Sequence, residues 1–370
     1  MPTRDDLRSL FEYHLESGLH HGAQLAVYHE GELVADLAGG VTGPDGDPTT
    51  ADRPHVLFSC TKPFSGVCVH HLADHGHLDY DDPVADHWPE FAEPGTKKAE
   101  VTVRHVLSHQ AGLPQAGIDG RPGDWDDPDA VAASLEEAEL AFDPGETAAY
   151  HALTYGWLVG ELVRRVSGTP IDEYAADHVF SPLGMDDTTI GNASDEVATL
   201  VGFDPFDRCR ESAAGLGTMT NAEAAATFND PTVRGAVAPA ATGVGTARDM
   251  ARFYACLVNG GELDGTRILS RAAVEEALTQ QVRVPRDGTL GVPRRYALGF
   301  ERGGEVEDKY GTLSPESVFG HGGLGSIVGW GDSEAGLGVA YVTNGIRDEY
   351  EHATRASTIA DGVRRTLSLY

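Results

Sequence analysis

A serine and a lysine three residues apart have the spacing that nucleophilic catalysis requires. Ser59 and Lys62 lie in the segment LFSCTKPF, where β character gives way to a helical pattern. A serine that opens a helix lies among unpaired N–H groups at the positive end of the helix dipole, which favours a nucleophile. Lys62 falls on the same helix face, so its amine can reach the Ser59 hydroxyl. The alternative, a capping serine followed by a solvated lysine, is disfavoured because the sequence uses so few lysines.

Tyr150 is a candidate general base. It follows a Pro-Gly turn in PGETAAYHALTYGWLVGELV and precedes an apolar helical run. A phenol titrates near pH ~10 in water, so Tyr150 can accept a proton near neutrality only beside a cation such as Lys62, which favours the phenolate. A packing role is the alternative. Tyr155 lies inside the helical run and is predicted to be a core residue.

A glycine-rich segment, GHGGLG, begins at Gly320 and contains His321, Gly322, Gly323 and Leu324. It matches the pattern of a dinucleotide-binding loop, but such a loop must open a helix, and here a β-like run follows. We therefore interpret it as a strand edge whose glycines let a substrate approach, so that a backbone N–H can bind a developing oxyanion. A hairpin turn without a catalytic role is the alternative.

The histidines and cysteines of the chain form no recognisable metal-binding or redox motif. The histidines of PFSGVCVHHLADHGHL form no HExxH motif and are predicted to be solvated on a helix face, without a metal. They are His70, His71, His75 and His77. The cysteines form no CxxC pair and are predicted to be reduced and mostly structural. They are Cys60, Cys68, Cys209 and Cys256.

The distribution of apolar residues predicts how the chain positions these groups. Residues 23–40 have the pattern of a β-hairpin, residues from about 58 to 280 are mainly helical, and short β runs return near the C-terminus. This order predicts an α/β (α+β) fold with a mixed, antiparallel sheet built from both termini and flanked by helices. Residues 1–57 and 286–370 would form that domain, residues 58–285 an inserted helical domain, and the active site their interface.

The charge of the chain excludes several partners. The 370 residues include 58 acidic and 27 basic side chains, for a formal net charge of −31. Nucleic acids and anionic membranes are therefore poor partners, and the acidic, lysine-poor surface resembles that of halophilic proteins. We expect activity to persist or rise in molar salt, where repulsion between carboxylates is screened. No secretory apolar segment or membrane-spanning run is seen, so a soluble cytoplasmic protein is predicted.

Three motifs in this order resemble those of the serine β-lactamase and penicillin-binding-protein superfamily, specifically its class C-like esterase branch. SCTK resembles S-x-x-K, YHA lies where the family has Y-x-N, and HGG lies where it has K-T-G or H-x-G. The resemblance implies that Ser59 is acylated and that Lys62 takes its proton or holds Tyr150 as a phenolate. Tyr150 would serve as base, acid and activator of water. It also implies an oxyanion hole made by the N–H groups of Ser59 and Leu324, with His321 replacing the lysine of the third motif.

Two departures from the family motifs bear on the substrate. Ala152 replaces an asparagine that binds the amide side chain of β-lactams, and His321 offers a switchable charge in place of a permanent ammonium. Both favour an ester or small amide that lacks the penicillin carboxylate. Segments 115–130 and 204–235 are candidate pocket walls. Trp125 and Phe228 are possible acyl contacts there, although surface packing is their favoured role.

We therefore predict a serine hydrolase that cleaves small carboxylic esters, or amides, through an acyl-serine and without a cofactor. The alternatives within the enzymes are a β-lactamase or D,D-peptidase, and a D-aminopeptidase or acyltransferase. A catalytically silent member that binds a ligand or a partner is the alternative from another class. The oligomeric state is left open.

Overall fold

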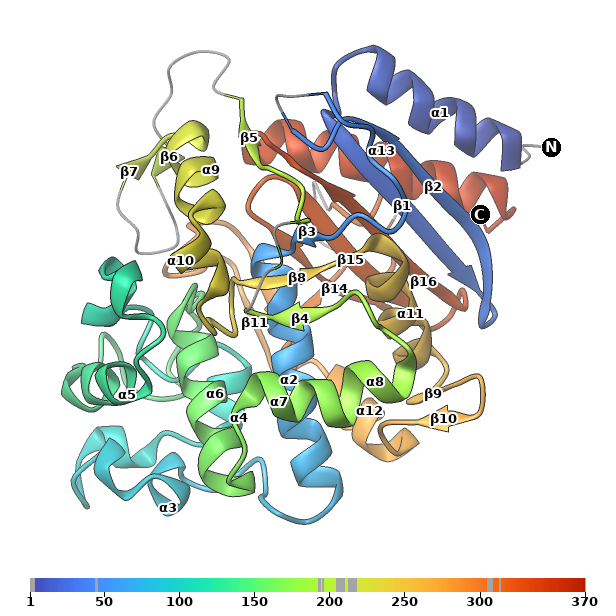
Figure 1. Cartoon of the computed structure of the whole chain (residues 1–370). Coiled ribbons are helices and arrows are strands. Elements are labelled where there is room, and N and C mark those ends of the chain that lie inside the picture. Colours follow the sequence, from blue (N-terminus) through green and yellow to red (C-terminus); the bar gives the residue numbers. More distant parts are fainter. Residues whose placement is uncertain are drawn as a thin grey trace.

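The computed structural model describes residues 4–369 except 44–45, 192–193, 195, 204–209, 212–217, 305–308 and 313. Within these residues, both ends of the chain build one eight-stranded antiparallel sheet, which confirms the predicted fold class (Figure 1). In spatial order its strands are β11 (Val282–Val284), β12 (Arg294–Tyr296), β13 (Glu301–Arg302), β14 (Val318–Gly323), β15 (Ile327–Asp332), β16 (Leu337–Thr343), β1 (Gly22–His29) and β2 (Glu32–Gly40). The sheet thus takes in β11, which precedes residue 286.

The predicted N-terminal hairpin is formed by β1 and β2. Its two-residue turn has positive φ at both positions, 51° at Glu30 and 83° at Gly31, as the twist of a tight hairpin requires. On its other side β1 pairs with β16, with Ala23 opposite Thr343. Strand β1, the first strand in the sequence, therefore has as one of its two neighbours a strand more than 300 residues further along the chain.

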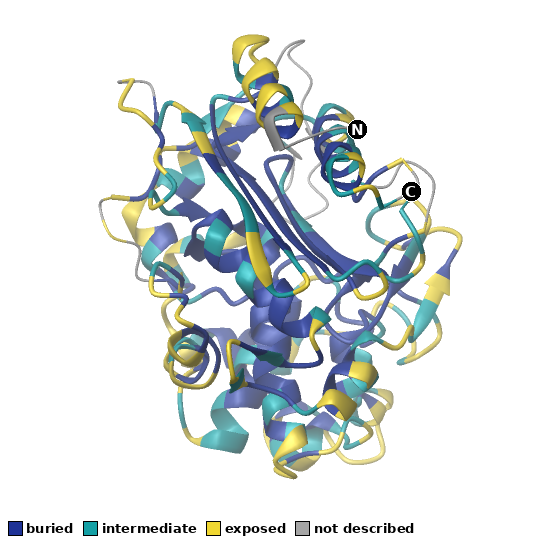
Figure 2. Ribbon diagram, turned by 90° about the vertical axis from the view of Figure 1, so that its right-hand side faces the viewer, coloured by how far each residue is buried: buried dark blue, intermediate teal, exposed yellow. Residues whose placement is uncertain are grey.

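Helices cover both faces of the sheet (Figure 1). Helices α1 (Arg4–Glu16) and α13 (Glu349–Thr366) lie together on one face, and α11 (Ala247–Val258) lies on the other against β1, β15 and β16. A Cβ on Gly338 of β16 would lie 2.5 Å from the Ala255 nitrogen, so only glycine permits this close approach of α11. Figure 2 shows the inner strands buried between these layers, whereas the edge strand β2 is partly exposed.

The helical part of the chain surrounds α2 (Thr61–Asp74), which packs mainly against α6 (Thr154–Ser167). The other helices are α3 (Val84–His87), α4 (Val103–Leu107), α5 (Pro128–Glu137), α7 (Ile171–Ala175), α8 (Ser181–Leu183), α9 (Asn221–Asn229), α10 (Pro231–Gly235) and α12 (Arg271–Leu278). The short strands outside the large sheet are β3 (His55–Val56), β4 (Thr189–Ile190), β5 (Val201–Gly202), β6 (Arg210–Glu211), β7 (Thr218–Met219), β8 (Gly243–Gly245), β9 (Glu262–Leu263), β10 (Thr266–Arg267) and β17 (Gly345–Ile346).

Helix α2 is buried on nearly all sides, which corrects the prediction of a solvated histidine face. His70 is fully buried, and its ring nitrogens bond to the Tyr80 hydroxyl and the Leu298 carbonyl, each at 2.9 Å. Helices packed on both sides of α2 leave no solvent-facing stripe at this position. The remaining histidines of the segment are half-buried or exposed: His71, His75 and His77.

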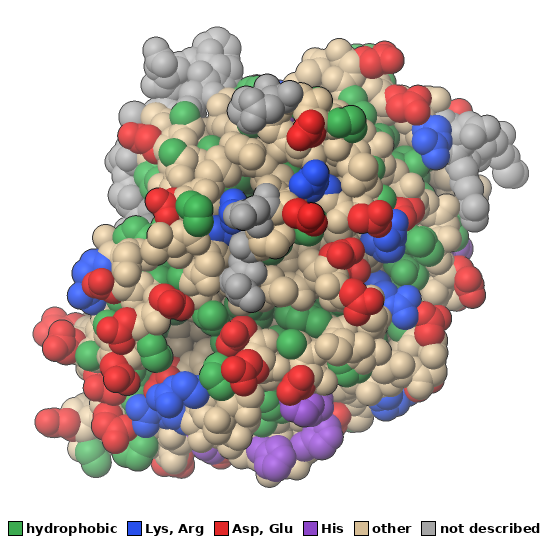
Figure 3. Space-filling view, viewed as in Figure 1, with side chains coloured by type: hydrophobic (Ala, Val, Ile, Leu, Met, Phe, Trp, Pro, Cys, Tyr) green, Lys and Arg blue, Asp and Glu red, His purple; other side chains and the backbone are tan. Residues whose placement is uncertain are grey.

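The surface carries the excess of acid. Figure 3 shows Asp and Glu side chains spread over one face of the molecule, with histidine side chains gathered at its lower edge. Among the described residues, no helix is long and apolar enough to cross a membrane. Within the same residues, no group of three or more His, Cys, Asp or Glu side chains could hold a metal ion.

Candidate active site

Ser59 lies in a short 3-10 turn, η1 (Phe58–Cys60), that runs directly into α2. Phe58 has a positive φ of 47°, which is rare for a bulky residue and is found where surrounding structure enforces a strained turn. No side-chain capping bond is made at the start of η1 or of α2, so Ser59 does not cap a helix. The capping alternative is therefore wrong, and the hydroxyl is available for other partners.

Lys62 is the second residue of α2, and its side chain is fully buried, so the alternative of a solvated lysine is wrong. Its Nζ donates hydrogen bonds to Ser59 Oγ at 3.0 Å, to the Ala152 carbonyl at 2.7 Å and to the Ala240 carbonyl at 3.2 Å. Burial lowers the pKa of Lys62 to about 7, because a desolvated ammonium is disfavoured. Near neutral pH much of Lys62 is therefore a neutral amine, whose two N–H groups donate to the Ala152 and Ala240 carbonyls and whose electron pair accepts from the Ser59 hydroxyl.

Tyr150 lies in the loop that precedes α6 and is buried beside these two residues. Its ring centroid is 4.8 Å from Lys62 Nζ. Burial raises the pKa of Tyr150 well above 10, although hydrogen bonding with Ser59 opposes this shift. Lys62 thus lies beside Tyr150 as required for a phenolate, but burial favours the neutral phenol. Tyr155 is fully buried in the core, as predicted.

Strand β14 passes closely beside the turn that carries Ser59. The Cys60 thiol donates to the His321 carbonyl at 3.2 Å, and a Cβ on Gly323 would lie only 2.7 Å from the Leu57 carbonyl oxygen. Leu324, which follows the strand, has a positive φ of 30°. Strand β13 pairs with β14 only before His321, so the glycine-rich end is a strand edge that then turns into β15. A strand, not a helix, follows the glycines, which excludes a dinucleotide-binding loop.

His321 is buried, and its ring lies 5.9 Å from the Tyr150 ring. Its Nδ1 bonds to the Gly322 carbonyl at 2.7 Å, while Nε2 is buried without a partner in the described part of the chain. Burial lowers the pKa of His321 to about 3, so the ring is neutral at physiological pH. The nearby cation is Lys309, whose Nζ forms a 2.5 Å ion pair with buried Glu301.

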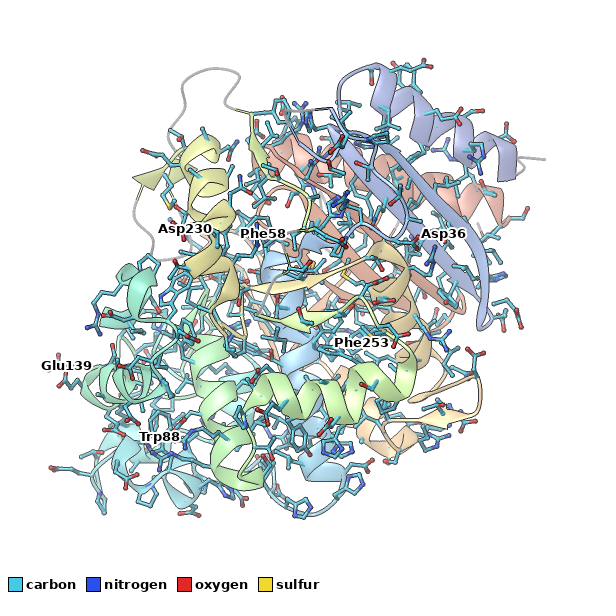
Figure 4. All side chains as sticks on the ribbon, viewed as in Figure 1. Asp36, Phe58, Trp88, Glu139, Asp230 and Phe253 are labelled. Atoms are coloured by element: carbon cyan, nitrogen blue, oxygen red, sulfur yellow. The ribbon has the colours of Figure 1, made fainter. Side chains whose placement is uncertain are left out.

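An aromatic cluster lies beside the nucleophile. Phe58 lies at the start of α2 (Figure 4), and its ring packs edge-on against Phe228 of α9 at 4.9 Å between centroids. The ring centroid of Trp125 lies 6.4 Å from that of Phe228 and 5.8 Å from that of Trp157. Trp125 and Phe228 are each 2% exposed, so the surface role favoured for them is wrong. All of segment 115–130 is described, whereas residues 204–209 and 212–217 of the second predicted wall lie outside the described residues.

Sequence reasoning missed the groups that act through their backbone or arrive from distant segments. Ala240 contributes only a carbonyl, which leaves no side-chain signal, and Lys309 and Glu301 belong to no motif. The rarity of lysine, which helped to locate Lys62, could also have drawn attention to Lys309. Three cysteines are free and buried: Cys60, Cys68 and Cys256. Cys209 lies outside the described residues.

Comparison with known proteins assigns the chain to a family. The beta-lactamase family pattern matches residues 7–364. The esterase/beta-lactamase LipL of Mycobacterium tuberculosis is 36% identical over 343 residues, which cover 87% of this chain and 77% of LipL. A penicillin-binding protein homologue from Caulobacter crescentus has a TM-score of 0.84 at 32% identity, with 99% of each chain covered. A family VIII carboxylesterase has a TM-score of 0.83 at 31% identity, covering 99% of this chain and 98% of the other. The chain therefore belongs to the beta-lactamase family, as its three motifs predicted.

Proposed function

We propose that this protein hydrolyses small carboxylic esters through an acyl-Ser59 intermediate. One contact carries the proposal: the Ser59 hydroxyl is 3.0 Å from the buried amine of Lys62. A serine becomes an effective nucleophile when an adjacent base can take its proton, and the lowered pKa of Lys62 provides that base near neutral pH. The relatives named as esterases support the same reaction.

In the acylation step, Ser59 Oγ attacks the ester carbonyl carbon while its proton moves to Lys62 Nζ. The bond from carbon to the leaving alcohol oxygen then breaks, and that oxygen takes the phenolic proton of Tyr150. Lys62 returns its extra proton to Tyr150, which restores both groups. Water repeats the sequence in reverse to release the acid, as microscopic reversibility requires. The neutral phenol favours Lys62 over Tyr150 as the first proton acceptor.

The tetrahedral oxyanion is proposed to bind between the N–H groups of Ser59 and Leu324. The close approach of β14 to η1, together with positive φ at Phe58 and Leu324, supports this assignment. Two such donors stabilise charge that develops only in the transition state. Gly322 and Gly323 would leave the backbone beside the substrate uncovered.

The proposed substrate lacks a carboxylate beside the scissile bond. His321 carries no charge near neutrality, and Glu301 compensates the charge of Lys309. Ala152 offers a carbonyl already bonded to Lys62 and no side-chain amide. The aromatic cluster of Trp125, Phe228 and Phe58 is the proposed contact for the acyl chain.

The test is the Ser59→Ala variant. We expect hydrolysis of p-nitrophenyl butyrate to fall by about 10⁴-fold or more, because the nucleophile is lost, while the thermal unfolding midpoint stays within ~2 °C. A fluorophosphonate should label Ser59 in the parent protein, as read by mass spectrometry. Undiminished turnover in the variant, or a label on another serine, would overturn the proposal.

β-Lactam hydrolysis is the second candidate, because LipL carries both activities in its name. A nitrocefin assay beside the ester assay separates the two, and faster nitrocefin turnover would reverse the order. A D,D-peptidase, a D-aminopeptidase or a silent binding protein remains an alternative with weaker support. The two-domain boundaries, the cytoplasmic location and the adaptation to salt stay predictions.

A further inference from the structure

The loop that carries Tyr150 has no regular secondary structure, so its backbone needs other partners. Three successive N–H groups find them in only two residues. Ala149 N–H donates to the His109 carbonyl at 3.1 Å, Tyr150 N–H donates to Asp287 Oδ1 at 3.0 Å, and His151 N–H donates to His109 Nδ1 at 3.1 Å. The backbone on both sides of Tyr150 is thereby fixed by contacts from two distant segments.

Asp287 accepts hydrogen bonds from several surrounding groups through its carboxylate. It is 1% exposed, and Oδ1 also accepts from the N–H groups of Thr289 and Leu290 at 2.8 Å each. Oδ2 accepts from the Tyr296 hydroxyl at 2.8 Å. A buried carboxylate with this many donors has one well-defined position. It therefore ties the Tyr150 backbone to β12 and to the loop before it.

His109 holds the same loop from the other side. It has a positive φ of 61° and is 3% exposed. Its ring contacts those of Tyr150 and Tyr296 at centroid distances of 4.9 and 4.7 Å. Burial holds the pKa of His109 well below its usual value, so Nδ1 keeps the electron pair that accepts the His151 N–H. The strained backbone is thus maintained at a residue that bonds the loop through both its carbonyl and its ring.

We propose that His109 and Asp287 are positioning residues that fix the hydroxyl of Tyr150 for proton transfer. The inference rests on the proposed function, in which that hydroxyl protonates the leaving alcohol. Proton transfer and near-attack geometry are sensitive to displacements of about 1 Å, which can change rates by about 10²-fold. Neither residue needs to touch the substrate, because each acts through the backbone of the tyrosine loop.

Two pairs of variants test the effect on turnover of p-nitrophenyl butyrate. Asp287→Ala and His109→Ala should each lower kcat by about 10²-fold with KM changed less than about threefold. Asp287→Asn keeps an oxygen for the Tyr150 N–H, and His109→Asn tolerates positive φ and presents an acceptor near Nδ1. Both conservative variants should recover kcat to within about tenfold of the parent. If the Asn variants fold but do not recover kcat, the proposal is contradicted.

A double-mutant cycle separates positioning from general structural damage. If the two residues act through the Tyr150 hydroxyl, Asp287→Ala and His109→Ala should lower kcat less than about threefold in a Tyr150→Phe background. The rate at which a p-nitrophenyl phosphonate labels Ser59 gives a second readout when steady-state turnover is too slow. Equal losses in both backgrounds would overturn the proposal. A Tyr150→Phe variant with full activity would instead overturn the role of Tyr150 itself.

Matched controls use buried residues of the same types away from this loop. His70 is fully buried with bonds to Tyr80 and Leu298, and Asp249 is buried with bonds to Thr188 and Asp187 N–H. His70→Ala and Asp249→Ala should lower the unfolding midpoint while kcat of the folded protein stays within about threefold. If an Ala variant of the tyrosine loop does not fold, the Asn variants carry the cycle. A control that lowers kcat as much as Asp287→Ala would refute the positioning role.

Discussion

The two sides of the proposed active site differ in the charged groups that they present. On the helical side, Ser59, Lys62 and Tyr150 come together, and Lys62 is desolvated so that its amine is available. On the strand side, the place of the family's cationic residue holds a neutral His321. The cation that is present, Lys309, is paired with Glu301. On the helical side the amine of Lys62 is the proposed proton acceptor, whereas on the strand side His321 is neutral and Lys309 is paired with Glu301.

This difference indicates that the acyl chemistry and the recognition of substrate charge can vary independently within one fold. A general base works best when its pKa lies near the working pH. Burial brings the pKa of Lys62 into that range, because the desolvated ammonium is disfavoured. Recognition of a carboxylate needs an uncompensated cation, which burial of His321 and pairing of Lys309 remove. The strand side still supplies backbone N–H groups, which need no charge. Four predictions test this contrast.

The largest effect is expected for Lys62→Met on the helical side. Removal of the amine leaves Ser59 without a base, and kcat/KM for p-nitrophenyl butyrate should fall by about 10⁴-fold. Lys98→Met is the matched control, since Lys98 Nζ also has three hydrogen-bond partners, here all carbonyls, and burial lowers its pKa to about 8. The control should keep activity within about threefold. Comparable losses of activity in both variants would show that the amine of Lys62 does not act as the base for Ser59.

Gly323→Ala tests the contact between the two sides. The new Cβ would lie 2.7 Å from the Leu57 carbonyl, so β14 must move away from the turn that carries Ser59. We expect kcat to fall about 10²-fold, because an oxyanion donor is displaced. Gly235→Ala, at a glycine whose added Cβ meets nothing within 4 Å, is the control with normal activity. An active Gly323→Ala enzyme would argue against the proposed oxyanion hole.

The pH profile tests the charge of the helical side. The active form of Lys62 is the neutral amine, so kcat/KM should fall about tenfold per pH unit below about 7 and level off above it. Burial also raises the pKa of Asp119 to about 6, which makes it the competing titrating group. Asp119→Asn should therefore leave the inflection near 7 in place. Its disappearance in that variant would assign the titration to Asp119.

The smallest effect concerns the strand side. The parent protein should hydrolyse a neutral ester at least about tenfold faster than its analogue with a carboxylate beside the scissile bond, because His321 is neutral and Glu301 compensates the charge of Lys309. His321→Lys restores the family's cation and should narrow this ratio by a few-fold, with the neutral ester as the internal control. An unchanged ratio would show that the charge at this position does not select substrates.

Sequence reasoning located the side chains that carry the proposed chemistry but not what surrounds them. The motifs identify Ser59, Lys62 and Tyr150 because side-chain types and their order are visible in a sequence. The rise in the pKa of Tyr150 was not visible in the sequence, since burial depends on packing between distant segments. The Ala240 carbonyl and the Asp287 carboxylate reach the site across long separations that no local pattern reveals.

The errors at His70, Trp125 and Phe228 share one cause. Polar and apolar residues alternate around these positions in a way that suits a surface helix or loop, and nothing local shows that a second layer covers them. The fold class was predictable because β runs at both ends require a common sheet. The covered face of α2 was not, since it depends on how α6 and its neighbours pack.

The pairing of β1 with β16 has a consequence for biosynthesis. Ala23 and Thr343 lie opposite each other, so the N-terminal hairpin must wait for about 300 further residues to be translated before its partner strand exists. Strand pairing over such a sequence separation is slow and leaves an apolar edge exposed in the meantime. The turn with Ser59 emerges from the ribosome long before β14. A nascent chain truncated before β14 therefore has the proposed nucleophile without the proposed Leu324 N–H donor, and we expect it to be inactive in ester hydrolysis.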